Sequence, residues 1–492
     1  MKLQNLISAF PCEIRGGTLD TEIESLEYDS RNSGAGAIFF CLPGARSDGH
    51  DFAMQAYSNG CRAFVLERYL DLPDDAAQLK VSRSREALAF FSAKFFGNPA
   101  KSLILVGITG TKGKTTTAIM IREILCRAGL QCAYIGSNGV DIGEDHYETA
   151  NTTPESRDLH RYFRMMLDKG LTHAVIEVSS QALCNYRIAG IDFDTVIYTN
   201  LSPDHIGEGE HSSFEEYRDA KRKLFTDYKS KNIVYNSDDK YAHFMISGAT
   251  ANLVSYSVAA ESDFKAENIR PYREKTSLGI DFDVLHDGIR SGVRLRTPGK
   301  FSAENGLAAI AAASLLGVSI RRSSDALSSL SIKGRFEIVD AFDEITFIID
   351  YAHNGISLTH ALSVLREYSP SRLICVFGTV GGRTFCRRKE LAEAASKLAD
   401  FSIITSDNPD FESPSNIIED ILSYFDKHSP YTVIEDREEA VRFAVKFAEK
   451  GDIVLFAGKG HENYQLIKGK KFPFSERAII LDEAAKVSLA VF

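Results

Sequence analysis

Long apolar stretches and a leader segment are both missing from this sequence. No run of about 18 apolar residues, the shortest that spans a bilayer as a helix, occurs along the chain. The first segment, MKLQNLISAFPCEIRGG, has only a short apolar stretch, and Glu13 and Arg15 follow it closely, so we expect no signal peptide. We therefore expect a cytoplasmic protein with no insertion into a membrane.

Paired cysteine motifs and an excess of positive charge are missing as well. The eight cysteines are scattered and form no CxxC pair, so we expect reduced thiols that are buried as small apolar side chains. The net charge of −10 at pH 7 argues against general binding of nucleic acid, because a phosphate backbone selects basic surfaces. This charge still allows local basic pockets for phosphate groups.

The sequence does contain an alternation of short apolar strands with helical patterns. Several predicted strands are apolar on both faces, as a buried parallel sheet requires. The clearest strands lie at residues 37–42, 63–67, 103–110, 173–180, 195–202, 346–353, 372–378, 401–407 and 452–460. Helical patterns at 115–129 and 388–400 separate them, which is typical of an α/β fold.

The length of the chain predicts several domains. A chain of 492 residues is too long for one ordinary core. Gly and Pro in FFGNPAKS (95–102) precede a strong strand, and LSSLSIKGRFEIVD (327–340) separates an Ala-rich helix from a new series of strands. We therefore expect three domains, at residues 1–98, 99–332 and 333–492.

A strand that runs into a loop rich in Gly and Lys, and then into a helix, marks a candidate nucleotide site. The loop consists of Gly110, Thr111, Lys112, Gly113, Lys114, Thr115 and Thr116. Its backbone N–H groups can hold phosphate oxygens, Lys114 can neutralise their charge, and the Thr115 hydroxyl can bind Mg²⁺. Ile108 stands where the general pattern has glycine, so the loop is a variant. The motif predicts binding of ATP or GTP and leaves the reaction open.

Further segments accompany this loop in a fixed order along the chain. They are NTTPES (151–156), EVSSQAL (177–183), TNLSPDHIGEGEHSSFEEYRDAKRKLF (199–225), GRFEIV (334–339), DYAHNG (350–355), DNPDFESP (407–414) and AGKGHENYQ (457–465). Together they closely resemble the Mur ligases, and among these the enzymes that add the third residue of the wall peptide. The resemblance spans almost the whole chain. It implies a UDP-substrate domain, a central P-loop-type ATPase domain with a mostly parallel sheet, and a C-terminal Rossmann-like α/β domain that binds the amino acid.

The resemblance also implies an ADP-forming acid–amino-acid ligase that acts through an acyl phosphate. Such phosphoryl transfer needs positioning and cations more than a protein nucleophile. The family's catalytic positions match Lys114, Glu177, His205 and Lys221, and its Mg²⁺ positions match Thr115, Glu177, His205 and Lys221. Without the resemblance, Lys221 in YRDAKRKLF would be interpreted as a solvated helix lysine. The resemblance implies that CO₂ carbamylates it, which gives an oxygen ligand suited to Mg²⁺; Lys223 is the neighbouring alternative.

Other positions match the family's substrate contacts. The positions for ATP, besides the loop 110–116, are Asn305, Arg335, Asp350, His353 and Asn354. The positions for the UDP-sugar-peptide are Ser30, Thr152, Thr153, Ser179, Asn185 and Arg187. Asn185 stands where many relatives have Gln, and Ser302 replaces a common Asn near Asn305. Arg187 can pair with a carboxylate of the anionic substrate. Taken alone, each of these residues would be interpreted as a loop or helix-cap residue.

The amino acid that is added is predicted from one departure within the family motif. The positions for the amino acid match Asp407, Asn408, Pro409, Asp410 and Glu462. Relatives that add meso-diaminopimelate carry DNPR, where Arg pairs with the extra carboxylate, and here Asp410 stands instead. An acid at that place attracts an ammonium group and repels a carboxylate. We therefore expect L-lysine, with ornithine as the second choice, although GKGHENYQ and PFSER (473–477) resemble the diaminopimelate type.

Three other functions compete with this interpretation. A Mur-like subunit of an amidotransferase complex is expected to carry a metal-finger cysteine cluster in its middle domain, and this sequence has none. A folylpolyglutamate synthetase lacks the NTTPES and SSQ arrangement. A regulatory or motor ATPase does not explain the segment around Lys221 or the DNPD motif. We expect a monomer whose partners are UDP-MurNAc-dipeptide and a free diamino acid, with ATP, Mg²⁺ and a CO₂-derived carbamate.

Overall fold

A computed structural model of the chain describes residues 1–44, 47–204, 206–207, 210–275, 277–382 and 385–490. The chain forms two compact units. One contains Met1–Lys265 with Leu307–Ser323, and the other contains Ala266–Gly306 with Ser324–Phe492. The three-domain division at 1–98, 99–332 and 333–492 stays a prediction. No helix in the described ranges is long and apolar enough to cross a membrane.

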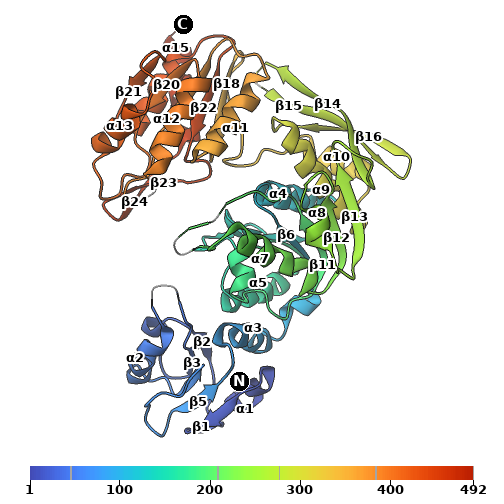
Figure 1. Ribbon diagram of the computed structural model, residues 1–492, viewed down its shortest axis with the longest axis vertical. Helices are drawn as coiled ribbons and strands as arrows, with labels where there is room; N and C mark the ends of the chain where they lie inside the picture. The colour runs from blue at the N-terminus through green and yellow to red at the C-terminus, as the bar shows by residue number, and fades with distance from the viewer. Residues whose placement is uncertain (45–46, 205, 208–209, 276, 383–384, 491–492) are drawn as a thin grey trace. The chain divides into compact units, whose positions relative to one another are not determined.

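The first unit begins with a small sheet in the order β1-β5-β4-β3-β2 (Figure 1). Its strands are β1 (Glu13–Arg15), β2 (Ser25–Glu27), β3 (Ala37–Phe40), β4 (Ala63–Leu66) and β5 (Ala77–Lys80). All pairs are parallel except β1 with β5. The strand AIFF of β3 is buried along its whole length, because α3 (Ser84–Phe95) covers one face of the sheet and α2 (Ala53–Ser58) the other.

The second sheet of this unit has β6 (Ile104–Thr109) near its centre and follows the order β13-β12-β11-β6-β10-β7-β8-β9 (Figure 1). The other strands are β7 (Cys132–Gly136), β8 (Gly139–Ile142), β9 (Asp145–Tyr147), β10 (His173–Glu177), β11 (Phe193–Tyr198), β12 (Ser230–Asn236) and β13 (Asn252–Ser257). The strands from β13 to β7 pair in parallel, and β8 and β9 are antiparallel. The carboxyl ends of β6, β10 and β11 therefore meet at one edge of the sheet, where ligands bind in open α/β folds.

Helices connect these parallel strands and complete the core. They are α4 (Lys114–Arg127), α5 (Ser156–Asp168), α6 (Ser180–Cys184), α7 (Phe214–Thr226) and α8 (Ala242–Ile246). Apolar residues of α5, α7 and α8 join one core cluster with the strands. Helix α9 (Lys300–Leu315) leads from the second unit back into the first, and α10 (Ile320–Leu327) follows it.

The second unit contains most of β14 (Phe264–Glu274), with β15 (Ser277–His286) and β16 (Ile289–Leu295), and a six-stranded, mostly parallel sheet. Strands β15 and β16 pair antiparallel. The six-stranded sheet, in the order β17-β18-β22-β19-β20-β21, consists of β17 (Glu337–Phe342), β18 (Ile345–Asp350), β19 (Leu373–Phe377), β20 (Phe401–Ile404), β21 (Tyr431–Val433) and β22 (Ile453–Ala457). Only β17 pairs antiparallel in it.

Helices cover both faces of the six-stranded sheet. One face carries α11 (Gly355–Arg366), α12 (Cys386–Leu398) and α13 (Pro414–Ser423) (Figure 1). The other carries α14 (Arg437–Phe447) and α15 (Glu476–Ala490), and a hairpin of β23 (Tyr464–Ile467) and β24 (Lys470–Pro473) precedes α15. The α/β prediction is confirmed, with each predicted strand and helix present. Several strands end before their predicted limits, because the residues after them turn into loops at the carboxyl edge.

Candidate functional site

The phosphate loop joins β6 to α4 and depends on two glycines. Gly113 has φ +84° and Gly110 has φ +153°, backbone angles that residues with a side chain rarely adopt. A Cβ atom at Gly110 would lie 2.0 Å from Thr199 Oγ1, so no larger residue fits there. Lys114 Nζ donates hydrogen bonds to the carbonyl oxygens of Gly110 at 2.8 Å and Thr111 at 3.0 Å. The cation predicted to hold phosphates therefore lies over the loop itself.

The loop is held from the side by the residues that follow β11. Thr111 N donates to Asn200 O at 2.9 Å, Lys112 N donates to Asn200 Oδ1 at 2.9 Å, and Thr199 Oγ1 donates to Lys112 O at 2.7 Å. Sequence reasoning did not single out Asn200. The signal that could have found it is its position two residues after β11, which is adjacent to β6 in the sheet.

Glu177, at the end of β10, is a fully buried carboxylate. Its Oε2 accepts a hydrogen bond from Thr115 Oγ1 at 3.0 Å, and its Oε1 accepts from Tyr134 OH at 2.6 Å and from Ser137 N at 3.0 Å. Among the described residues it forms no ion pair, so only uncharged donors surround it. A buried carboxylate without a charged partner is a candidate ligand for a cation, and oxygen ligands suit Mg²⁺.

The described part of the chain offers few other metal ligands. It holds no group of three or more His, Cys, Asp or Glu side chains that could bind a metal ion. His205, the predicted ligand in SPDH, lies outside the described residues. A metal at Glu177 and Thr115 would therefore take further oxygen ligands from nucleotide phosphates or from a modified Lys221.

Lys221 lies in α7 with only 1% of its surface exposed, so it is not a solvated helix lysine. Its Nζ lies 4.7 Å from the ring centroid of Tyr217, whose hydroxyl donates to Thr111 Oγ1 at 3.1 Å. The helix therefore places Lys221 beside the phosphate loop. Burial first, and then the nearby positive charge of Lys114, lower the pKa of Lys221 well below its ordinary value.

The residues expected to contact the sugar-peptide meet at the same edge of the sheet. Thr153 Oγ1 donates to the backbone oxygen of Glu177 at 2.7 Å, and Ser179 N donates to Thr153 Oγ1 at 3.1 Å. Thr152 Oγ1 lies 3.1 Å from Ser137 Oγ. The structure thus brings Thr152, Thr153 and Ser179 together around Glu177.

Arg187 and Asn185 lie on the short segment that follows α6. Arg187 donates from Nε to Glu155 Oε1 at 3.0 Å and from Nη1 to Thr153 O at 3.1 Å. Arg85 Nη1 donates to the same Glu155 oxygen at 3.1 Å, and sequence reasoning missed this second arginine. Asn185 Nδ2 donates to Gln181 O at 2.9 Å. The two guanidinium groups share one carboxylate, which leaves local positive charge for an anionic ligand.

Ser30 lies apart from these residues, next to the small N-terminal sheet. It begins a short 3₁₀ helix, Ser30–Asn32, and its Oγ donates to Gln55 Oε1 at 2.8 Å. Asn59 Nδ2 donates to Ser30 O at 2.9 Å. No described hydrogen bond joins Ser30 to the residues around Glu177.

The second unit carries the remaining residues predicted for ATP. Asp350, at the end of β18, accepts from Phe336 N at 2.8 Å, and burial raises its pKa while the charge of Arg335 opposes that rise. The Arg335 guanidinium carbon lies 5.1 Å from the ring centroid of Tyr351, and its buried Nε has no hydrogen-bond partner among the described residues. An unpaired guanidinium nitrogen of this kind suits an anionic ligand.

Three further ATP positions have clear local surroundings. The His353 ring is tilted by 54° against the ring of Tyr351 with centroids 4.6 Å apart, and its Nδ1 lies 2.8 Å from Tyr351 O. Asn354 Oδ1 accepts from Ser357 N at 2.9 Å and caps α11, so that amide already has a structural function. Asn305 lies in α9 and is buried.

Most residues predicted for the amino acid gather around a lysine that sequence reasoning missed. The fully buried Lys459 lies 3.1 Å through Nζ from Asp407 Oδ1 and 3.3 Å from Glu462 Oε2, and it also donates to Asn408 Oδ1. Asn408 Nδ2 donates to Glu462 Oε2 at 2.9 Å. The available signal for Lys459 was its position in the motif GKGHE, directly after Gly458. Asp407, Asn408 and Glu462 therefore form one charged cluster.

Asp410 points away from that cluster toward the hairpin β23–β24. Its φ is +51°, and its Oδ1 accepts from Gly469 N at 2.7 Å. Its backbone pairs with the hairpin as well, since Asp410 N donates to Leu466 O at 3.0 Å. Asp410 and Pro409 line a hollow of about 520 Å³, together with Phe411, Glu412, Arg437, Gln465 and Lys468.

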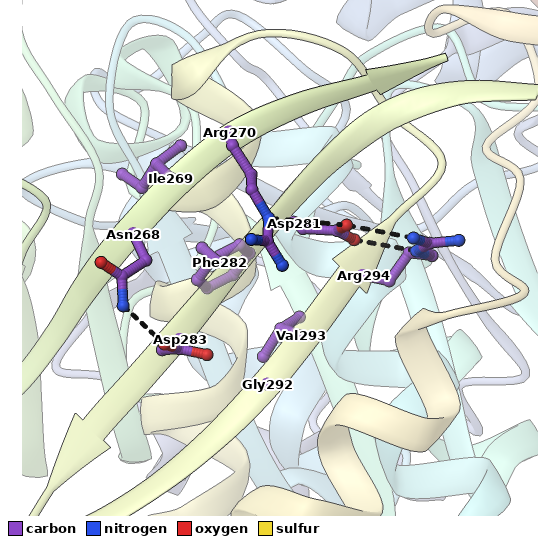
Figure 2. Close-up of a pocket in the computed structure, with 9 residues that line it drawn as sticks. All are labelled: Asn268, Ile269, Arg270, Asp281, Phe282, Asp283, Gly292, Val293 and Arg294. Atoms are coloured by element: carbon purple, nitrogen blue, oxygen red, sulfur yellow. Dashed lines mark hydrogen bonds and ion pairs between the residues drawn. The ribbon is translucent and has the colours of Figure 1, made fainter. Parts of the chain in front are cut away.

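Another hollow, of about 580 Å³, lies on the strands β14–β16 and contains none of the predicted site residues. Figure 2 shows that its charged side chains pair with one another across the strands: Asn268 Nδ2 donates to Asp283 Oδ2 at 2.8 Å, and Arg294 binds both oxygens of Asp281. Because these side chains pair with one another, this hollow is a weaker candidate for the functional site than the phosphate loop.

A phosphate loop at the edge of a parallel sheet, followed by a separate Rossmann-like sheet, defines a class of ATP-dependent ligases. Three family models cover most of the chain: "Mur ligase family, catalytic domain" at residues 22–96, "Mur ligase middle domain" at 108–313 and "Mur ligase, glutamate ligase domain" at 334–460. The chain belongs to the Mur ligase family and is an ATP-dependent ligase.

Individual relatives match over nearly the full length. UDP-N-acetylmuramoyl-L-alanyl-D-glutamate–2,6-diaminopimelate ligase 1 of Clostridium acetobutylicum is 38% identical over 483 residues, with 98% of each chain covered. The UDP-N-acetylmuramoyl-L-alanyl-D-glutamate–2,6-diaminopimelate ligase of Geobacillus thermodenitrificans is 39% identical over 490 residues, covering 97% of this chain and 98% of the relative. A solved structure of a 2,6-diaminopimelate ligase matches with a TM-score of 0.72 and 29% identity over 99% of this chain and 100% of its own.

Proposed function

We propose that this protein joins a diamino acid to UDP-MurNAc-L-Ala-D-Glu while converting ATP to ADP and phosphate. One observation carries the proposal: the buried contact between Thr115 of the phosphate loop and Glu177, with Thr152 and Thr153 at the same strand ends. The names of relatives that are 38% and 39% identical over almost the whole chain support this substrate.

The reaction proceeds in two balanced steps. The carboxylate of the dipeptide attacks the γ-phosphorus of ATP, and the bond to the β–γ bridging oxygen breaks, so that an acyl phosphate and ADP form. The amine then attacks the acyl carbon, loses a proton, and expels inorganic phosphate. Lys114 and the loop N–H groups hold the phosphates, while Arg187 and Thr153 hold the substrate. Bound Mg²⁺ would neutralise charge on the phosphate oxygens beside Thr115 and Glu177.

Lys221 is the candidate for modification by CO₂. Its unprotonated amine attacks CO₂, a C–N bond forms, and one proton is released, which leaves a carbamate with two oxygen donors. Complete burial and the nearby charge of Lys114 favour the unprotonated amine that this step requires. The carbamate oxygens would extend the oxygen-rich site around Glu177.

We propose meso-diaminopimelate as the added amino acid, because relatives matching 97% or more of this chain carry that substrate in their names. The sequence-based expectation of L-lysine depended on Asp410 standing where relatives carry Arg, with its carboxylate facing the substrate. That carboxylate accepts a hydrogen bond from Gly469 N, which weakens the reason for the expectation. L-Lysine and ornithine are the two alternatives.

A panel of amino acids tests the proposal directly. ADP release is measured with UDP-MurNAc-L-Ala-D-Glu and, in turn, meso-diaminopimelate, L-lysine or L-ornithine, with each substrate also left out. We expect ADP release only when both substrates are present, and the highest kcat/KM with meso-diaminopimelate. Faster turnover of L-lysine would restore the first expectation, and turnover without the UDP-substrate would contradict the proposed function.

Several broader expectations belong to the same proposal. The segments 1–98, 99–332 and 333–492 would bind the UDP-substrate, ATP and the amino acid in turn. A cytoplasmic location and a monomeric state stay predictions. No observation favours the amidotransferase subunit, and folylpolyglutamate synthases at 14% and 15% identity are similar in fold alone.

A further inference from the structure

Glu177 is held by two residues, Tyr134 and Ser137, that no sequence motif singled out. Tyr134 lies in β7 and Ser137 directly follows this strand, which is the parallel neighbour of β10. Their side chains therefore reach the carboxyl edge of the sheet where Glu177 ends β10. Neither residue was expected to contact a nucleotide, a metal or the sugar-peptide.

The Tyr134 hydroxyl fixes one oxygen of Glu177. Its ring is 1% exposed, and its OH donates to Glu177 Oε1 at 2.6 Å. Asn138 N donates to the same hydroxyl oxygen at 3.3 Å, which directs the hydroxyl hydrogen toward the carboxylate. A short bond between buried groups, with a further donor behind it, restricts the rotation of the Glu177 side chain.

Gly136 makes room for this contact. A Cβ atom at Gly136 would lie 2.2 Å from Glu177 Oε1 and 2.3 Å from Tyr134 OH. Both distances are far shorter than a van der Waals contact, so any side chain there would drive the two groups apart. The strand therefore has glycine where the phenol and the carboxylate meet.

Ser137 connects Glu177 to the sugar-peptide side of the site. Its backbone N donates to Glu177 Oε1 at 3.0 Å, and its Oγ donates to Oε2 at 3.4 Å. The same Oγ lies 3.1 Å from Thr152 Oγ1. A continuous chain of hydrogen bonds thus runs from Thr115 of the phosphate loop through Glu177 and Ser137 to Thr152.

We propose that Tyr134 and Ser137 are positioning residues that fix Glu177 for Mg²⁺, and that Ser137 couples this carboxylate to substrate bound at Thr152. The part concerning Thr152 rests on the proposed function. The chemistry is that of hydrogen-bonded groups behind a metal ligand, which orient the ligand without touching the metal. Binding of the sugar-peptide at Thr152 would reorder the Ser137 hydroxyl and so change the affinity of the metal site.

The first experiment measures metal binding without turnover. Mn²⁺, in place of Mg²⁺, is titrated by electron paramagnetic resonance into the full-length protein with a non-hydrolysable ATP analogue. We expect Tyr134→Phe to weaken Mn²⁺ binding about 10-fold or more, as loss of such partners commonly does, while analogue binding without metal is unchanged. Tyr198→Phe is the matched control, because Tyr198 is equally buried and its OH donates to Asp239 Oδ1 at 2.6 Å.

The outcomes separate this inference from the proposed function. A wild-type protein that binds neither the analogue nor Mn²⁺ would contradict the assigned nucleotide site. A wild type that binds both, with Tyr134→Phe binding Mn²⁺ equally well, would overturn the role of Tyr134. If Tyr198→Phe weakens Mn²⁺ binding as much as Tyr134→Phe does, the effect is general loosening and the assignment is also wrong.

The second experiment tests the coupling through Ser137. Binding of UDP-MurNAc-L-Ala-D-Glu is measured calorimetrically with and without the metal-loaded ATP analogue. We expect the two ligands to change each other's affinity in the wild type, and the effect to disappear in Ser137→Ala and return in Ser137→Thr, which restores a hydroxyl. Unchanged coupling in Ser137→Ala, or no coupling in a wild type that binds both ligands, would overturn this part of the inference.

Discussion

Replacing Lys221 by methionine should make the protein more stable and inactive. Methionine has nearly the same length and no charge, so it fits the buried position beside Tyr217 without the cost of removing an ammonium group from water. The charge of Lys114 nearby adds repulsion that the variant also loses. A gain in stability on removing a side chain is unusual, because most substitutions destabilise.

The dependence of this gain on pH follows from the lowered pKa. A lysine with a lowered pKa in the folded state binds its proton more readily in the unfolded state. Wild-type stability therefore rises with pH between the folded pKa and the ordinary value of 10.5, and this contribution is lost as pH falls. The slope in that window is about 1.4 kcal/mol per pH unit, or about 3 to 5 °C in melting temperature for a domain of this size.

The assay compares melting temperatures of wild type and Lys221→Met in CO₂-free buffer between neutral pH and about pH 10. The variant should melt higher at neutral pH, and the difference should shrink as pH rises. A difference that stays constant with pH would refute the reasoning, because it would show that the ammonium is not desolvated. In activity assays, Lys221→Ala should be nearly inactive and partly rescued by a short-chain carboxylic acid, whereas Lys223→Ala should keep its activity.

Three further predictions follow from other residues. Lys114→Ala should lower ADP release by about 100-fold or more with the fold intact by circular dichroism, because phosphate charge is no longer neutralised, and near-normal release would contradict the phosphate-loop assignment. His160 is buried without hydrogen-bond partners in the described structure, and burial lowers its pKa to about 4. The wild type should therefore lose stability as pH falls from about 6.5 toward 4, and the His160→Phe variant should lose less. Equal losses in melting temperature would show that His160 is not responsible. Asp410→Arg should raise the kcat/KM ratio of meso-diaminopimelate to L-lysine about tenfold, and an unchanged ratio would mean that residue 410 does not face the amino acid.

The sequence was sufficient for the parts of the site that follow directly from strand and loop order. β6, its glycine loop and α4 are adjacent in sequence, so the phosphate site could be predicted from one segment. Burial of Lys221 could not, because the segment YRDAKRKLF has charges on every side and only the packing of α7 shows which one turns inward. Only the resemblance to the family singled out that lysine.

Residues that support the site from behind were also missed, for a common physical reason. Tyr134 lies in a strand, and Ser137 and Asn200 follow strands, that are next to β10 or β6 in the sheet but distant from them in sequence. A strand pattern shows which residues face the core, but it does not show which neighbouring strand a side chain meets. The pairing of β7 with β10 provides that information, and it brings a phenol against a carboxylate that lies 43 residues away.

Asp410 shows how a single motif position can mislead about specificity. Its φ of +51° lies in the left-handed region, which Asp and Asn tolerate better than most residues, and its carboxylate binds the backbone of the hairpin turn at Gly469. The backbone therefore accounts for an Asp at this position, whatever the substrate. In the cluster formed by the other predicted residues, the carboxylates of Asp407 and Glu462 both pair with the single ammonium group of Lys459, so one negative charge is in excess. That excess suits an ammonium group, which meso-diaminopimelate, lysine and ornithine all carry. Discrimination of diaminopimelate from the other two must therefore depend on where its distal carboxylate lies, and Asp410→Arg tests whether that place is at residue 410.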